Sequence, residues 1–183
     1  MLVGSTWIQR WRVPLGFLSA ALFFILARPR PVTLLAGAFV SLFGLSLRAW
    51  AAGHIRKNDA LAISGPYAYT RNPLYLGSFF LGLGFTIGSG RWLLGLLFAA
   101  LFLGIYLPVM RVESRTMAQL FGESFSPYAA AVPLFFPRLT PYRTDSKQTR
   151  FDRNLYLRYR EYEAALGLLV AWALLIIKAY FVP

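Results

Sequence analysis

Five long apolar stretches constrain the fold of this chain more than any other feature of its sequence. A helix needs about 20 apolar residues to cross a bilayer, and about 17–25 residues are typical. The sequence therefore predicts an all-α fold, a polytopic membrane helix bundle with about five transmembrane helices. The stretches are Val13–Ala27, Val32–Ala52, Leu74–Gly90, Trp92–Met110 and Ala164–Val182.

Composition agrees with one integral membrane domain over residues 1–183. Hydrophobic residues make up 57% of the chain and charged residues 14%, whereas soluble domains average about 45–50% and about 25%. A soluble protein of this length could not remove so much apolar surface from water. The composition therefore argues against a soluble enzyme and against a disordered chain.

The first apolar stretch has a second interpretation as a cleaved signal peptide. Arg10 and Arg12 precede it, and it ends at Leu26-Ala27. Signal peptidase sites need small residues near the cut, but Ile25 at the third position before this cut is not small. We expect a retained span, with cleavage as the open alternative.

Charge predicts the orientation of the spans. The chain has 19 lysines and arginines against 7 acidic residues, a formal net charge of +12. An excess of Lys and Arg marks cytoplasmic loops, and the basic residues divide fourteen to four in favour of the side that holds the N-terminus. We therefore expect a cytoplasmic N-terminus and no nucleic-acid partner. The first side holds Arg10, Arg12, Arg56, Lys57, Arg71 and nine basic residues between Arg111 and Arg160, and the other holds Arg28, Arg30, Arg91 and Lys178.

The chain is poor in the residue types that bind metals. It has no cysteine and one histidine, His54. Disulfides, thiolate nucleophiles and cysteine metal sites are thereby excluded, and one histidine does not make a zinc site. We expect no metal.

The first long cytoplasmic segment, Gly53–Pro73, contains tight turns. Pro73 fixes its own φ angle and disfavours a helical conformation at Asn72, so we expect Pro73 to be the first helical residue of the third span. Tyr67 and Arg71 then lie in a constrained loop at the membrane surface. Such a loop either places its aromatic side chains at the membrane interface or holds polar side chains at the fixed positions that a binding site needs.

Glu113 is the acidic residue that most needs explanation. The fourth span is predicted to continue as a helix to Phe121 and to stop at Gly122. At helical spacing Glu113 shares a face with Met117 and Phe121, close to bilayer depth. A carboxylate there needs a cationic partner, a polar ligand or a proton, and Arg71 or Arg48 could pair with it.

Arg48 lies within the second span. It could snorkel to the interface, pair with Glu113 or serve an anionic ligand, and we favour snorkelling.

The remaining cytoplasmic chain is predicted to lie along the membrane. Val132–Leu139 is too short and too rich in proline to span it. Residues 150–183 read as an interfacial helix followed by the last span, and Thr144–Gln148 reads as a polar linker.

Two motifs resemble a known family. The run SGPYAYTRNPLYLG at residues 64–77 resembles the signature of the isoprenylcysteine carboxyl methyltransferases, which related phospholipid methyltransferases share. A second set resembles that family's later motif, and the core of the resemblance spans residues 48–139. This second set consists of Glu113, Leu120-Phe121-Gly122, Tyr128, Val132-Pro133 and Pro137.

The resemblance implies an integral membrane methyltransferase that uses S-adenosyl-L-methionine, with its active site facing the cytoplasm. It implies catalytic roles for Arg71, Asn72 and Glu113, and a substrate contact for Arg111. Asn72 stands where the family often has histidine, so this position cannot titrate. The residues implied to bind the cofactor are Leu61, Tyr67, Asn72, Pro73, Leu74, Tyr75 and Glu113.

The methyl acceptor implied by the resemblance is lipidic or prenylated. A carboxylate needs no general base, whereas an amine must lose a proton before it attacks, and no dedicated base is evident; a carboxylate is therefore favoured over a lipid headgroup. Two other functions stay open: an NADPH-dependent membrane reductase of the sterol-reductase type and a non-catalytic membrane scaffold.

Single introduced cysteines test the orientation, because the chain has no cysteine of its own. With an impermeant maleimide, Ala60→Cys should stay unlabelled in intact cells and become labelled in inverted vesicles. Arg91→Cys, on the opposite side, should show the reverse. Labelling of position 60 from outside only would overturn the predicted topology.

Overall fold

A computed structural model describes residues 7–56, 60–143 and 149–181. Within these ranges the chain forms helices and no strand, and an isolated bridge joins Arg56 to Ala60. The α-helices are α1 (Trp7–Leu26), α2 (Pro31–Ala52), α3 (Pro73–Gly88), α4 (Trp92–Leu101), α5 (Leu107–Phe121), α6 (Phe125–Ala131), α7 (Arg153–Arg158) and α8 (Tyr162–Phe181). Three shorter turns complete the order, the 3₁₀ turns η1 (Gly65–Ala68) and η3 (Gly122–Ser124) and the π-helical turn η2 (Phe102–Tyr106).

The all-α prediction is confirmed for the described residues. Three of their helices are long and apolar enough to cross a membrane: α2, the continuous helix Trp92–Ala131, and α8. The third predicted span is a shorter apolar helix, α3, of 16 residues. The first, except for its last residue Ala27, lies within α1, which has 20 residues.

Proline and glycine set the helix ends as the sequence predicted. Pro73 is the first residue of α3, with Asn72 just before it. The hairpin between α3 and α4 turns at Gly90, which has φ of +66°, and α5 ends at Gly122, which has φ of +48°. Both glycines adopt left-handed backbone that costs other residues about 1–2 kcal/mol.

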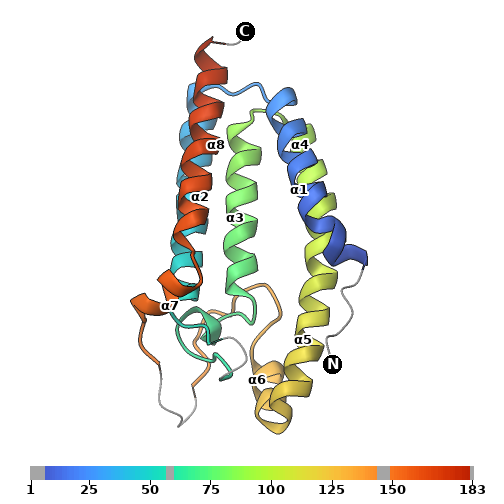
Figure 1. Cartoon of the computed structure of the whole chain (residues 1–183), viewed down its shortest axis with the longest axis vertical. Coiled ribbons are helices and arrows are strands. Elements are labelled where there is room, and N and C mark those ends of the chain that lie inside the picture. Colours follow the sequence, from blue (N-terminus) through green and yellow to red (C-terminus); the bar gives the residue numbers. More distant parts are fainter. Residues whose placement is uncertain (1–6, 57–59, 144–148, 182–183) are drawn as a thin grey trace.

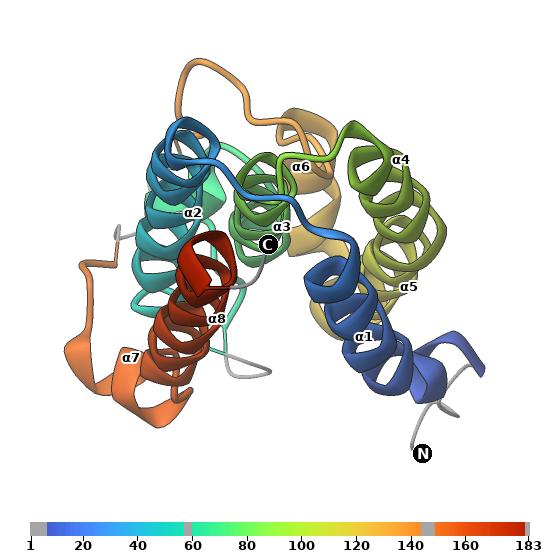
Figure 2. The same ribbon diagram turned by 90° about the horizontal axis from the view of Figure 1, so that it is seen from above.

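The closest helix packing in the bundle is between α2 and α3. Figure 2 shows that α3 lies between two groups of helices, with α2 and α8 on one side and α1, α4 and α5 on the other. Gly37 of α2 and Gly84 of α3 face one another so closely that a methyl group at Gly84 would lie 2.6 Å from the Gly37 carbonyl oxygen. Small residues permit such an approach in lipid, where van der Waals packing drives helix association. The contact therefore depends on glycine at both positions.

Arg48 joins three parts of the bundle. Its Nη2 lies 2.8 Å from Oε1 of Glu161, in the turn between α7 and α8, and its Nη1 donates to Ser78 Oγ of α3 at 2.6 Å. The expectation that Arg48 pairs with Glu113 is therefore wrong. The partner is a carboxylate 113 residues away, which satisfies the guanidinium inside the bundle.

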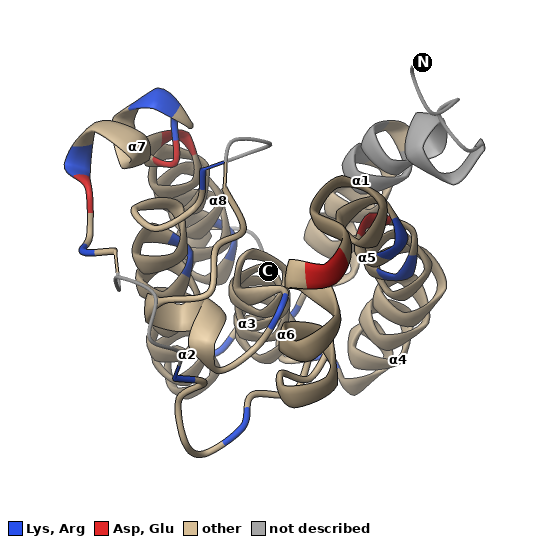
Figure 3. Ribbon diagram, turned by 90° about the horizontal axis from the view of Figure 1, so that it is seen from below, with Lys and Arg blue, Asp and Glu red and all other residues tan. Residues whose placement is uncertain are grey.

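The two long loop segments meet at one end of the bundle. In Figure 1 the chain between α2 and α3, helix α6 and helix α7 all lie at the lower end, whereas the α1–α2 and α3–α4 connections lie at the upper end. Figure 3, viewed from below, shows charged residues on α7, while α3 and α4 carry none. Most of the charged residues that the structure describes thus lie toward the lower end, whereas Arg28, Arg30 and Arg91 lie in the connections at the upper end.

Several sequence predictions lie outside the described residues. They concern Lys57, the Thr144–Gln148 linker, the last residues of the fifth span and the side chains of Arg10 and Arg12. Residues 132–139 are described and irregular, and Phe136 and Leu139 there are 78% and 98% exposed. That this segment lies along the membrane surface stays a prediction.

The α2–α3 contact predicts a strong effect of one methyl group. Gly84→Ala should separate the two helices, because its methyl would meet Ser41 Oγ as well as Gly37, and overpacking typically costs about 1–3 kcal/mol. The matched control is Gly167→Ala on the exposed surface of α8, where the methyl meets nothing within 4 Å. We expect a lower thermal midpoint in detergent for Gly84→Ala alone, and equal midpoints would contradict the packing argument.

Candidate functional site

The two sequence motifs are joined by backbone hydrogen bonds. Arg71 N–H donates to the Pro133 carbonyl at 2.9 Å, and Arg138 N–H donates to the Tyr69 carbonyl at 2.9 Å. Residues 131–142, which we call the strap, therefore run along the loop at residues 64–72, which we call the motif loop. The strap fixes the loop's backbone where it meets α3.

Side chains strengthen this attachment. Thr70 Oγ1 donates to the Phe135 carbonyl, and Asn72 Nδ2 donates to the Leu134 carbonyl, both at 2.9 Å. The amide nitrogen of Asn72 is therefore committed to the strap. From α6, Tyr128 OH donates to the Tyr67 carbonyl at 2.9 Å.

A cavity of about 400 Å³ lies between the motif loop, residues 55–56 and 60–62, and one face of α5. Its volume is in the range of small-molecule sites, about 300–1,000 Å³. Eight of the nine residues that the sequence singled out line it: Leu61, Tyr67, Arg71, Asn72, Pro73, Leu74, Tyr75 and Glu113.

Arg111 is the exception. It is exposed and does not line the cavity. A helix turns about 100° per residue, so Arg111, two positions before Glu113, points to nearly the opposite side of α5. The substrate contact expected for Arg111 therefore lacks a place in this cavity.

Glu113 faces the motif loop from α5. Its Oε1 accepts a hydrogen bond from Tyr75 OH at 2.7 Å. The expected arginine partner is not seen among the described residues, since Arg71 Nη1 donates to Ser114 Oγ at 3.0 Å and Arg48 binds Glu161. Glu113 is exposed, so water or a ligand can reach its carboxylate.

Two buried donors of the cavity lining lack a hydrogen-bond partner within the described part of the chain. They are Tyr67 Oη and Arg71 Nε, and Tyr67 is only 6% exposed. Burial raises the pKa of Tyr67, so its phenol keeps its proton. Burial lowers the pKa of Arg71, although a guanidinium stays charged in proteins. Leaving a buried donor unsatisfied costs about 1–3 kcal/mol, so the lining is suited to acceptor atoms of a ligand.

Some residues of the site gave no signal in the sequence. Arg56 lines the cavity and adds a second cation to it, but no motif marked it. Ser114 accepts a hydrogen bond from the Arg71 guanidinium, and no motif marked it either.

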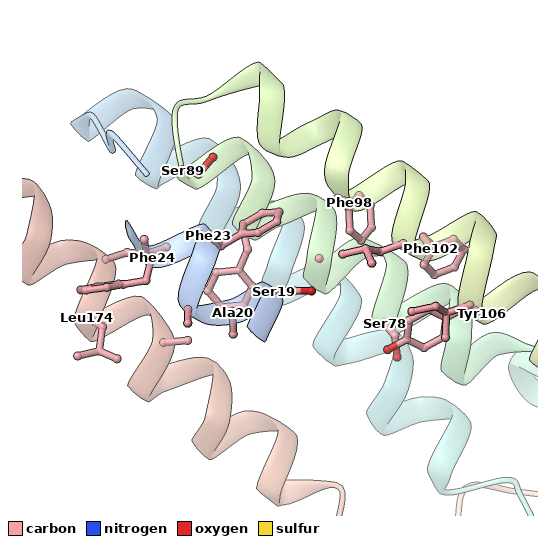
Figure 4. Close-up of a pocket in the computed structure, with 17 residues that line it drawn as sticks. Ser19, Ala20, Phe23, Phe24, Ser78, Ser89, Phe98, Phe102, Tyr106 and Leu174 are labelled. Carbon is pink, nitrogen blue, oxygen red and sulfur yellow. The ribbon is translucent and has the colours of Figure 1, made fainter. Parts of the chain in front are cut away.

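A second cavity lies among the helices. It has a volume of about 610 Å³ and is lined almost entirely by apolar side chains of α1, α3, α8 and the α4–η2 helix. Figure 4 shows Phe23, Phe98 and Phe102 on its walls, with Ser89 and Tyr106 toward opposite ends. Hydropathy did not reveal this cavity, because it does not distinguish apolar residues that pack from those that leave space.

Metal chemistry was not expected. Within the described residues, no group of three or more His, Cys, Asp or Glu side chains is placed to hold a metal ion.

Comparisons with known proteins point to one family. The phospholipid methyltransferase family matches residues 32–124, which include the motif loop and Glu113. The fission yeast Schizosaccharomyces pombe protein-S-isoprenylcysteine O-methyltransferase is 30% identical over 94 residues, covering 51% of this chain and 40% of its own.

Two bacterial relatives carry other names. The cobalt-zinc-cadmium resistance protein CzcN of Cupriavidus metallidurans is 36% identical over 160 residues, covering 79% of this chain and 72% of its own. The nickel-cobalt-cadmium resistance protein NccN of Alcaligenes xylosoxydans xylosoxydans is 33% identical over 126 residues, covering 63% and 59%. No solved structure matches the chain.

The unsatisfied phenol of Tyr67 predicts an unusual stability effect. Tyr67→Phe removes a buried hydroxyl that has no hydrogen-bond partner among the described residues, so the ligand-free protein should keep its thermal midpoint or gain stability of about 1 kcal/mol. Tyr128→Phe is the matched control, because it removes a hydrogen bond to the Tyr67 carbonyl and should cost about 0.5–1.5 kcal/mol. Equal losses in thermal unfolding would show that the Tyr67 hydroxyl is satisfied.

Proposed function

The chain belongs to the phospholipid methyltransferase family, and we propose that it is a multi-pass membrane enzyme that methylates a lipidic acceptor with S-adenosyl-L-methionine. The observation that carries the proposal is the cavity of about 400 Å³ between the motif loop and α5. It combines one carboxylate with buried donors that lack partners among the described residues.

The residues of the cavity suit the chemical groups of this cofactor, which carries a sulfonium, an ammonium, a carboxylate and an adenosine. Glu113 offers a negative charge to the cationic groups, and the rings of Tyr67 and Tyr75 offer faces that attract cations and stack on bases. Arg71 Nε and Tyr67 Oη can donate to the carboxylate or to the sugar and base. Leu61, Pro73 and Leu74 supply apolar lining for the adenosine.

When bound, S-adenosylmethionine supplies the methyl group: the acceptor's electron pair bonds the methyl carbon, and the carbon–sulfur pair leaves with the sulfur as S-adenosylhomocysteine. The Glu113 carboxylate attracts the positively charged part of the methyl donor. Tyr75 OH donates a hydrogen bond to this carboxylate at 2.7 Å and holds it in place. Asn72 has a positioning role. Its Nδ2 donates a hydrogen bond to the Leu134 carbonyl, which holds the motif loop against the strap. These residues orient the reactants, which is the main requirement of a direct displacement.

The cations of the cavity favour an anionic acceptor. Arg56 and Arg71 line it, and they attract a carboxylate more than an ammonium. A carboxylate attacks without losing a proton, so a dedicated base is unnecessary. We therefore favour a carboxylate, prenylcysteine-like or of another lipidic acid, over an amine headgroup.

The apolar cavity accommodates the chain of such an acceptor. It lies among the membrane helices, so a lipidic molecule can reach it from the bilayer while the water-soluble donor uses the loop end. The proposal includes five spans, a cytoplasmic N-terminus and a site at the cytoplasmic face, following the distribution of basic residues.

Ligand-induced stabilisation separates this function from its rivals. S-adenosylhomocysteine should raise the thermal midpoint of the detergent-solubilised protein, because a ligand that binds the folded state stabilises it. NADPH should not raise it. Stabilisation by NADPH alone would favour a reductase, and stabilisation by neither would favour a scaffold; both outcomes would reject the methyltransferase proposal.

Glu113 can be tested separately. Glu113→Gln should weaken S-adenosylhomocysteine binding in calorimetry by about 10- to 100-fold, since hydrogen bonds to charged groups contribute about 1.5–3 kcal/mol. Glu123→Gln is the matched control, because Glu123 is exposed and lies outside the cavity lining. Both variants should unfold at the wild-type temperature without ligand, and unchanged affinity in Glu113→Gln would remove this residue from the site.

A further inference from the structure

A pair of tyrosines stands between the two cavities. Tyr75 lines the polar cavity, and Tyr106 lines the apolar one. Their ring centroids are 5.7 Å apart, with the ring planes at 71°. This edge-to-face contact is a favourable geometry for aromatic rings, so the pair forms a common wall.

The wall depends on a π-helical turn. Phe102–Tyr106 interrupts the long helix, and Leu107 N–H donates to the Phe102 carbonyl five residues back. Pro108 explains the interruption, since it lacks an N–H and its ring would clash with the carbonyl four residues earlier, that of Gly104. One residue more per turn rotates the preceding side chains by about 100° relative to those that follow. Tyr106 is the last residue of this turn.

Further contacts fix the position of both tyrosine rings. The ring of Tyr106 stacks on Phe102, with centroids 5.1 Å apart and planes at 14°. Phe102 is 5% exposed and also contacts Phe135 of the strap at 5.3 Å. On the other side Tyr75 OH binds Glu113. The wall is thus fixed to the same strap that holds the motif loop.

The two ends of the apolar cavity differ in their surroundings. Figure 4 places Tyr106 and Ser78 toward one end and Ser89 toward the other. Ser78 accepts from Arg48, so polar chemistry lies close to the Tyr106 end. The Ser89 end is near Trp172, whose ring packs beside Gly88 and stacks on Phe85. An amphipathic molecule in the cavity would place its polar head toward Tyr106.

We propose that Tyr106 is a specificity-determining residue for the acceptor, closing the head end of the apolar cavity so that only a narrow reactive group passes beside Tyr75. The proposal rests on the proposed methyltransferase function. It names the acceptor class as one apolar chain that ends in a small nucleophile such as a carboxylate. Its size limit comes from the aromatic ring of Tyr106, not from the hydroxyl.

The first experiment measures binding without any reaction. In a protein that keeps Trp172 and has phenylalanine at the other four tryptophans, nitroxide-labelled stearic acid is titrated while Trp172 fluorescence is recorded. A label near the methyl end should quench Trp172 more strongly than a label beside the carboxylate, because the head lies at Tyr106. Ala20→Phe fills the cavity lining and gives the quenching that comes from surrounding lipid alone. Equal quenching by the two labels, or no difference from Ala20→Phe, would overturn the proposed orientation.

The second experiment changes the wall. Tyr106→Ala should let the stearic acid head move toward the polar cavity, so that quenching by the methyl-end label falls, whereas Tyr106→Phe should behave as wild type. With farnesylthioacetic acid and a variant branched beside its carboxylate as acceptors, Tyr106→Ala should raise the relative kcat/KM of the branched one by about tenfold or more, the scale of a pocket's discrimination. A change in quenching and in acceptor preference as large in Tyr106→Phe as in Tyr106→Ala would contradict a steric role.

S-adenosylhomocysteine affinity separates the two proposals. Both Tyr106 variants should bind it within a factor of about three of wild type, because Tyr106 lies outside the polar cavity lining. If the wild-type protein does not bind it, the proposed function fails, and the quenching series alone decides whether Tyr106 closes the apolar cavity. If it binds and the acceptor preference is unchanged in Tyr106→Ala, the specificity proposal fails by itself.

Discussion

The polar cavity depends on the backbone pairing between the motif loop and the strap. A loop at a membrane surface has peptide groups that need hydrogen-bond partners, and an unsatisfied group costs several kcal/mol where water is scarce. Here Arg71 N–H and the Tyr69 carbonyl are satisfied by residues more than sixty positions later. The pairing holds Tyr67 and Asn72 against the first turn of α3, and through Phe135 it also supports the π-helical turn. One segment thereby stabilises the lining of the polar cavity and the wall of the apolar one.

Helices and their ends were predictable from the sequence because their causes are local. A run of apolar residues predicts a span, Pro73 predicts a helix start, and Gly122 predicts a stop; all three appear in the structure. The resemblance of two motifs also selected residues that prove to line one cavity. Their roles there remain proposals, but their proximity could be anticipated because motifs that share one ligand must meet in space.

The charge partners could not be predicted, because periodicity identifies the face of a helix but not the residue opposite it. Arg48 binds Glu161 across 113 residues of sequence, a partner that no pattern marked. An arginine was one possible partner of Glu113, yet the carboxylate accepts a hydrogen bond from Tyr75. Arg111 was selected because it lies near Glu113 in the sequence. Two positions along a helix correspond to a rotation of about 200°, so its side chain points away from the cavity. The apolar cavity was equally hidden, since composition does not record which side chains leave a space.

The single aromatic layer of Tyr75 and Tyr106 has a consequence for turnover. Under the proposed function, a water-soluble donor and an acceptor dissolved in the bilayer reach opposite sides of this layer by different routes, so neither has to wait for the other to arrive or depart. Such an arrangement favours random order of binding, and it lets the apolar product diffuse into the bilayer while the spent donor returns to solution.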